Sequence, residues 1–232
     1  MGFQMKDSAE NSSLTPDVTM ELFAAVLNNS EALSSEAGLL LDAKHAPRAY
    51  ALAHLAHEEL AKCFGLLNIW LTQILSVANA HWKLFWKRWR HHGFKVQLAL
   101  AGDVIRQGVV QESISQTTPD LQHLPVDMAV RISNLYSGID SALPQQPELT
   151  RLREDSIYVD LRNGLIVTPA ATITNEMAEQ MVEAPKVNCR FMRSIADIDP
   201  TRLIEIGQHP AMEEIQVAWK SAAERSEPGA HD

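Results

Sequence analysis

Near the first quarter of the chain, side chains that could exchange protons or hold an anion follow one another closely. They are His54, His57, Glu58, Glu59 and Lys62, within an alanine- and leucine-rich stretch. On a helix either glutamate can pair with Lys62, and such an exposed pair contributes about 0.2–0.5 kcal/mol. A buried charge would instead cost several kcal/mol unless a wider polar network surrounded it. The residues alone favour a solvated pair, and burial would imply that network.

A metal site is a second interpretation of the same run. His54, His57 and Glu58 have helical spacing that could present two nitrogens and one oxygen from one face. The chain contains no Glu-x-x-His and no His-x-x-x-His motif, and only His91 and His92 offer plausible further ligands. We therefore predict no metal and no other cofactor.

Basic side chains gather once, between aromatic residues at positions 82–95. The members are Lys83, Lys87, Arg88, Arg90 and Lys95, with His91 and His92 beside them. The formal net charge of -9 argues against sequence-independent adhesion to nucleic acid, because that affinity comes from many cations neutralising phosphates. Residues 82–95 are thus the one candidate contact for a polyanion, and DNA is not an expected partner.

Several other classes of function lack their usual motifs. The chain has no Gly-x-Ser-x-Gly nucleophile elbow and no glycine-rich phosphate loop. Its two cysteines, Cys63 and Cys189, form no Cys-x-x-Cys pair, and the start has no secretory signal, which favours a cytoplasmic location. The most apolar run, residues 63–80, is interrupted by polar side chains, so we expect a buried helix and no membrane partner.

Hydrophobic spacing predicts a mostly α-helical protein. Thr15-Pro16-Asp17 is typical of a helix start, and that helix should run toward Ala43, with a place for a kink or a capped junction near residues 28–30. Pro47 should begin the central helix, which continues to Ile74. Further helices are expected at residues 82–89, 96–110, 126–143 and 148–155, with a break at Gly93 and a loop at 115–125.

One segment, residues 157–168, has the pattern of a short β-hairpin. Asn163-Gly164 separates two runs rich in β-branched and leucine side chains, which is typical of a tight turn. Thr174 should cap a helix through Ala184, and two more helices are expected at 185–195 and 210–224. We predict disordered tails at residues 1–14 and 226–232 around a single domain at 15–225.

Three segments carry a resemblance to a known family. Residues 49–62 form an alanine-rich helix ending in Glu-Glu-x-x-Lys, residues 85–95 are aromatic and basic with His-x-x-Lys at the end, and residues 153–169 contain Tyr-Val-Asp before a proline. In this order they resemble the AbiV abortive-infection family, a branch of the HEPN superfamily. The resemblance implies a HEPN-like helical bundle that pairs into a homodimer and stops phage propagation.

The resemblance also suggests where such a protein would act. It implies a shared polar site that binds a phage protein or RNA, formed or supported by Glu58, Glu59, Lys62, His92, Lys95, Arg153, Tyr158 and Asp160.

A metal-independent ribonuclease is the alternative function. Many HEPN proteins cut RNA through an Arg-x4-6-His motif, but here Tyr158 stands where that histidine would follow Arg153. A phenol is a poor general base at neutral pH, so on this alternative Arg153 would hold the phosphate and Tyr158 or His92 would move the proton. Formal matches at Arg48–His54, Arg202–His209 and Arg225–His231 are explained by chance. The sequence thus leaves open whether the protein is an enzyme.

Overall fold

A computed structural model describes residues 13–74, 82–99, 102 and 147–196, and it is mainly helical. The helices and strands are α1 (Pro16–Asp42), α2 (Ala46–Ile74), α3 (Trp82–Arg90), α6 (Pro147–Asp155), β1 (Asp160–Arg162), β2 (Leu165–Val167), α7 (Pro169–Thr172) and α8 (Asn175–Ala196). Residues 92–99 form one further helical segment. Our predictions for the tail at 1–12 and for positions 103–146 and 197–232 lie outside the described residues.

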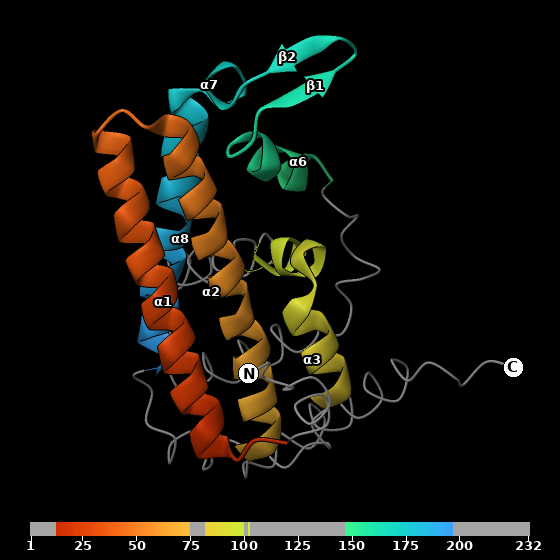
Figure 1. Cartoon of the computed structure of the whole chain (residues 1–232). Coiled ribbons are helices and arrows are strands. Elements are labelled where there is room, and N and C mark those ends of the chain that lie inside the picture. Colours follow the sequence, from red (N-terminus) through yellow and green to blue (C-terminus); the bar gives the residue numbers. More distant parts are fainter. Residues whose placement is uncertain (1–12, 75–81, 100–101, 103–146, 197–232) are drawn as a thin grey trace, which may run out of the picture.

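Three long helices form the scaffold. α1 and α2 lie side by side and are joined by a short connection, and α8 packs against both of them (Figure 1). Thr15 begins α1 as expected, because its hydroxyl accepts a hydrogen bond from the Val18 amide. Where the chain turns from α1 into α2, Lys44 has a positive φ of 65°, and the His45 amide donates to the Leu40 carbonyl.

The main core lies between these helices. Its fully buried side chains include Phe23 and Leu27 from α1, Leu60 and Phe64 from α2, and Met192 from α8. α2 is apolar on several sides, which explains why it is covered by more than one neighbour, as its sequence predicted. No helix in the described part is long and apolar enough to cross a membrane.

The capped junction that the sequence suggested in α1 is absent, and the helix is continuous from Pro16 to Asp42. Ser30, in the polar stretch that suggested a junction, is buried against α2. Its hydroxyl donates a 2.7 Å hydrogen bond to the Ala56 carbonyl. The polar residue therefore joins two helices rather than ending one.

α8 is likewise longer than predicted. Thr174 does cap it, since its hydroxyl accepts from the Met177 amide at 3.2 Å, but the helix continues through Pro185 to Ala196. The expectation of separate helices before and after Pro185 is wrong. Burial of Val182, Cys189 and Met192 on this helix stabilises the continuous form.

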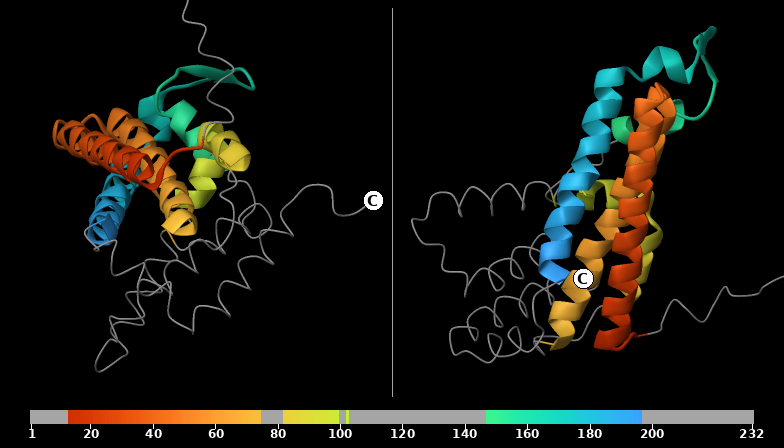
Figure 2. Two further views of the ribbon diagram at one scale, coloured as in Figure 1. Left: turned by 90° about the horizontal axis from the view of Figure 1, so that it is seen from below. Right: turned by 90° about the vertical axis from the view of Figure 1, so that its left-hand side faces the viewer.

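The hairpin agrees with its sequence pattern. β1 and β2 pair antiparallel with Leu161 opposite Ile166, and both Asn163 and Gly164 have positive φ, as the tight turn requires. The hairpin and α7 extend at one end of the scaffold, beside α6 (Figures 1 and 2). Leu161, Leu165 and Ile166 are largely exposed.

Candidate functional site

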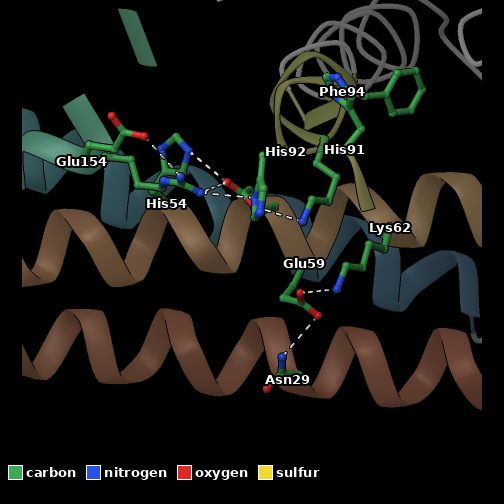
Figure 3. A network of polar contacts seen from close by, with 11 residues as sticks. Asn29, His54, Glu59, Lys62, His91, His92, Phe94 and Glu154 are labelled. Atoms are coloured by element: carbon green, nitrogen blue, oxygen red, sulfur yellow. Dashed lines mark hydrogen bonds and ion pairs between the residues drawn. The ribbon is translucent and has the colours of Figure 1, made fainter. Parts of the chain in front are cut away.

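A buried carboxylate on α2 is the centre of the candidate site. Glu58 is 3% exposed, and polar groups of four other residues surround it. At Oε2 lie His92 Nδ1 at 2.6 Å and Lys95 Nζ at 3.1 Å. At Oε1 lie Arg153 Nη1 at 3.0 Å and His54 Nε2 at 3.5 Å. We call Glu58, His54, His92, Lys95 and Arg153 the Glu58 cluster. Figure 3 shows the positions of His54 and His92 within this network of polar contacts.

Local capping positions two of these side chains. The helix of α3 ends at Arg90, and His91 starts the next segment, because its ring Nδ1 accepts a 3.0 Å hydrogen bond from the Phe94 amide. The break thus falls at His91 and not at Gly93, which lies within the helical segment. His92 and Lys95 are then three residues apart on one face of the first turn.

Arg153 reaches the cluster from the last turn of α6. Its Nη1 donates to Glu58, and its Nη2 lies 4.0 Å from the exposed Glu154 carboxylate. Residues 95 positions apart in the chain are thereby joined across α2 and α6.

The surroundings keep Glu58 ionised despite its burial. Burial alone would raise the pKa of this carboxyl, but the adjoining His54 and His92 rings and the charge of Lys95 outweigh it and lower the pKa well below its usual range. The polar network that burial of Glu58 would imply is therefore present, and the expectation of a solvated pair at Glu58 is wrong.

The 2.6 Å contact determines how the His92 ring is arranged. A carboxylate only accepts hydrogen bonds, so Nδ1 carries the proton and donates it to Glu58. The Arg153 guanidinium, 3.2 Å from the same nitrogen, then adjoins the ring without donating to it. In the neutral ring, Nε2 then carries the lone pair, on the opposite edge of a side chain that is 56% exposed. This arrangement suits proton transfer.

Glu59 and Lys62 form a separate pair on the side of α2 that faces α1 (Figure 3). Glu59 also accepts a 3.3 Å hydrogen bond from Asn29 of α1, and the Lys62 ammonium lies 4.8 Å from the centre of the Trp89 ring. Lys62 therefore pairs with Glu59 as predicted, whereas Glu58 takes other partners. These two residues support the packing of α1, α2 and α3.

Tyr158 and Asp160 line a second, more polar pocket of about 490 Å³ that Arg153 also lines. Tyr158 is 64% exposed, and Asp160 accepts hydrogen bonds from Arg162 Nε and the Leu161 amide, both at 2.8 Å. The hydrogen bond from Arg162 lowers the pKa of Asp160. Arg153 is thus shared between this pocket and the Glu58 cluster.

A partly buried ion pair that the sequence did not reveal holds the hairpin to α6. Both oxygens of Asp155, a buried side chain at the end of α6, accept from the Arg162 guanidinium, one of them at 2.9 Å. The two residues are separated by a helix end and a turn, so no helical or strand spacing connects them.

The basic stretch at 82–95 divides in the structure. Arg88 is buried with its guanidinium 4.6 Å from the Phe94 ring, and Lys95 joins the Glu58 cluster, while Lys83, Lys87 and Arg90 are exposed. Across the described residues, no group of three or more His, Cys, Asp or Glu side chains is placed to hold a metal ion. His54 and Glu58 contact each other within the polar cluster instead.

In a comparison with protein families, residues 19–189 match a model described as HEPN_AbiV, AbiV. The chain belongs to the AbiV family. Comparisons with curated proteins and with solved structures give no match. The AbiV match includes all three segments on which the resemblance rested, and membership points to a role in abortive infection of phage-infected cells.

Proposed function

We propose that this AbiV-family protein acts in abortive infection by binding RNA at the Glu58 cluster, as a homodimer. The observation that carries the proposal is the composition of the cluster: Lys95 and Arg153 together bring two positive charges to the single carboxylate of Glu58. An RNA phosphate could accept the guanidinium hydrogen bonds that Glu58 does not use.

Access to the cluster is through His92 and Arg153. The His92 side chain is more than half exposed, and Arg153 also lines the pocket beside the hairpin. The chain as a whole is acidic, with a formal net charge of -9, so RNA would be held at a local site and not over a broad surface.

Phage plaquing on cells that express the protein tests the role. Wild type should reduce plaque formation or arrest growth of infected cells, and Arg153→Ala should abolish this. Arg151→Ala is the matched control, because Arg151 lies on the same helix but pairs only with Glu148 and, at 4.0 Å, Asp155 among the described residues. Protection that is equal in wild type and Arg153→Ala would exclude a role for the cluster.

Purified protein tests the ligand and the assembly. Fluorescence anisotropy with labelled single-stranded RNA should give binding that Arg153→Ala weakens and Arg151→Ala does not. Capture of a phage protein in place of RNA would refute the RNA part of the proposal, and a monomer by light scattering would refute the dimer.

The Glu58–His92 contact favours a second candidate, a metal-independent ribonuclease. Glu58 fixes the ring so that Nε2 can take the proton of a ribose 2′-hydroxyl. The 2′-oxygen would attack the phosphorus of the adjacent phosphate, which Arg153 holds, and the 5′-oxygen would leave with the proton that His92 returns, giving a 2′,3′-cyclic phosphate. Tyr158, in the pocket that Arg153 shares, is the other candidate proton carrier.

Incubation with total RNA separates these candidates. A ribonuclease should cleave RNA in the presence of a chelator, and His92→Ala should lose this activity while Tyr158→Phe keeps it. Loss of cleavage in Tyr158→Phe but not in His92→Ala would assign the proton transfer to Tyr158. Intact RNA with wild type under all conditions would leave binding as the function.

A further inference from the structure

A mostly apolar cavity lies next to the Glu58 cluster, between α2, the helical segment 92–99, α6 and α8. Its volume is about 300 Å³, at the lower end of the range for small-molecule sites. An engineered apolar cavity of about half that volume holds benzene. Apolar side chains form most of the wall: Val96, Ala99, Leu149, Leu152, Met177 and Met181.

One end of this cavity is polar, and its hydrogen-bonding groups are not all used. His54 lines it, and its side chain is 4% exposed. Within the part of the chain that the structure describes, His54 Nδ1 has no hydrogen-bonding partner, and Nε2 has only the 3.5 Å approach to Glu58. Burying a polar atom in this way costs about 1–3 kcal/mol unless a partner is supplied.

The charge on Glu58 decides which hydrogen bond His54 can offer. Nε2 lies 3.5 Å from the carboxylate, so in the neutral ring the proton faces Glu58 and Nδ1 presents its lone pair. Tyr50, which also lines the cavity, is uncharged at neutral pH, and burial raises its pKa further, to about 12. An uncharged ligand suits these walls, since Lys95 and Arg153 already compensate the one charged group, Glu58.

We propose that this cavity binds a small, uncharged, mostly apolar molecule of about two fused rings that donates one N–H or O–H hydrogen bond to His54. The volume of the cavity limits the ligand to about two rings, and the apolar wall favours an apolar ligand. The unpaired acceptor on His54 requires one hydrogen-bond donor on the ligand. The cavity shares His54 and Glu58 with the Glu58 cluster, but the proposal does not depend on RNA binding, because His92 and Arg153, through which RNA would reach the cluster, are not among the residues that line the cavity.

Isothermal titration calorimetry of the full chain with indole and benzofuran tests this. The two probes have the same shape, but only indole carries an N–H donor. Indole should bind roughly two- to tenfold more tightly, as one neutral hydrogen bond provides. In His54→Phe this preference should vanish while benzofuran binding remains.

A cavity-filling variant completes the test. Ala184→Leu adds volume to the α8 side of the wall and should abolish binding of both probes. Glu179→Leu, at an exposed position of the same helix outside the lining, should bind as wild type does. Absence of heat with both probes in wild type, equal affinity for indole and benzofuran, or unchanged binding by Ala184→Leu would each overturn the proposal.

Discussion

Replacing Glu58 with glutamine should destabilise the folded protein far more than its conservative shape suggests. The glutamine side chain would keep the volume of the glutamate but remove the negative charge that Lys95 and Arg153 share. Removing one partner of a buried ion pair typically costs about 3–5 kcal/mol. The lower value applies here, because His92 is more than half exposed and Arg153 is 18% exposed, so water can solvate both partly.

Urea unfolding followed by circular dichroism measures this effect. We expect Glu58→Gln to lose about 3 kcal/mol of unfolding free energy. Glu148→Gln is the matched control, since Glu148 is exposed and pairs with an exposed Arg151, so its change should stay within about 0.5 kcal/mol. Loss of less than about 1 kcal/mol in Glu58→Gln would refute the view that this carboxylate holds α2, α6 and segment 92–99 together.

Other predictions concern pH, the hairpin and the first interhelical connection. The folded state lowers the pKa of Glu58 below its ordinary value of about 4.5, so the ionised carboxylate stabilises the fold fully above about pH 4.5 and less as the pH falls. The difference in unfolding free energy between wild type and Glu58→Gln should therefore shrink when unfolding is measured in acid. Arg162→Ala leaves the buried Asp155 without its bidentate partner, so amides at 160–167 should exchange with deuterium about tenfold faster while those of α1 do not change. Lys44→Gly removes the strain of a positive φ and should raise the urea midpoint, with a gain of about 0.5–1 kcal/mol; a lower midpoint would contradict this.

Sequence signals predicted helix ends and turns correctly where neighbouring residues alone determine the backbone conformation. Thr15 and Pro16 determine the start of α1, and Asn163-Gly164 determines the hairpin turn, because each acts through its own backbone geometry or cap. Pro185 misled the prediction because a proline signal is local, whereas packing of α8 against α1 and α2 is not.

The partners of Glu58 could not be predicted from spacing. Within its helix the nearest cation is Lys62, yet Lys62 pairs with Glu59, and the groups that reach Glu58 from outside α2 come from residues 34 to 95 positions away. The segments that resemble the AbiV family did include His92, Lys95 and Arg153, but only their arrangement around one buried carboxylate shows what joins them. Asp155 and Arg162 had no comparable signal.

The proline within α8 also affects the wall of the cavity. Pro185 has no amide hydrogen, so the carbonyl of Met181, one turn earlier, lacks its helical donor, and Met181 and Ala184 both line that wall. A helix bends most readily where such a bond is missing. We therefore expect any bending of α8 to occur at this turn, where it would change the width of the cavity while the helix on either side stays intact.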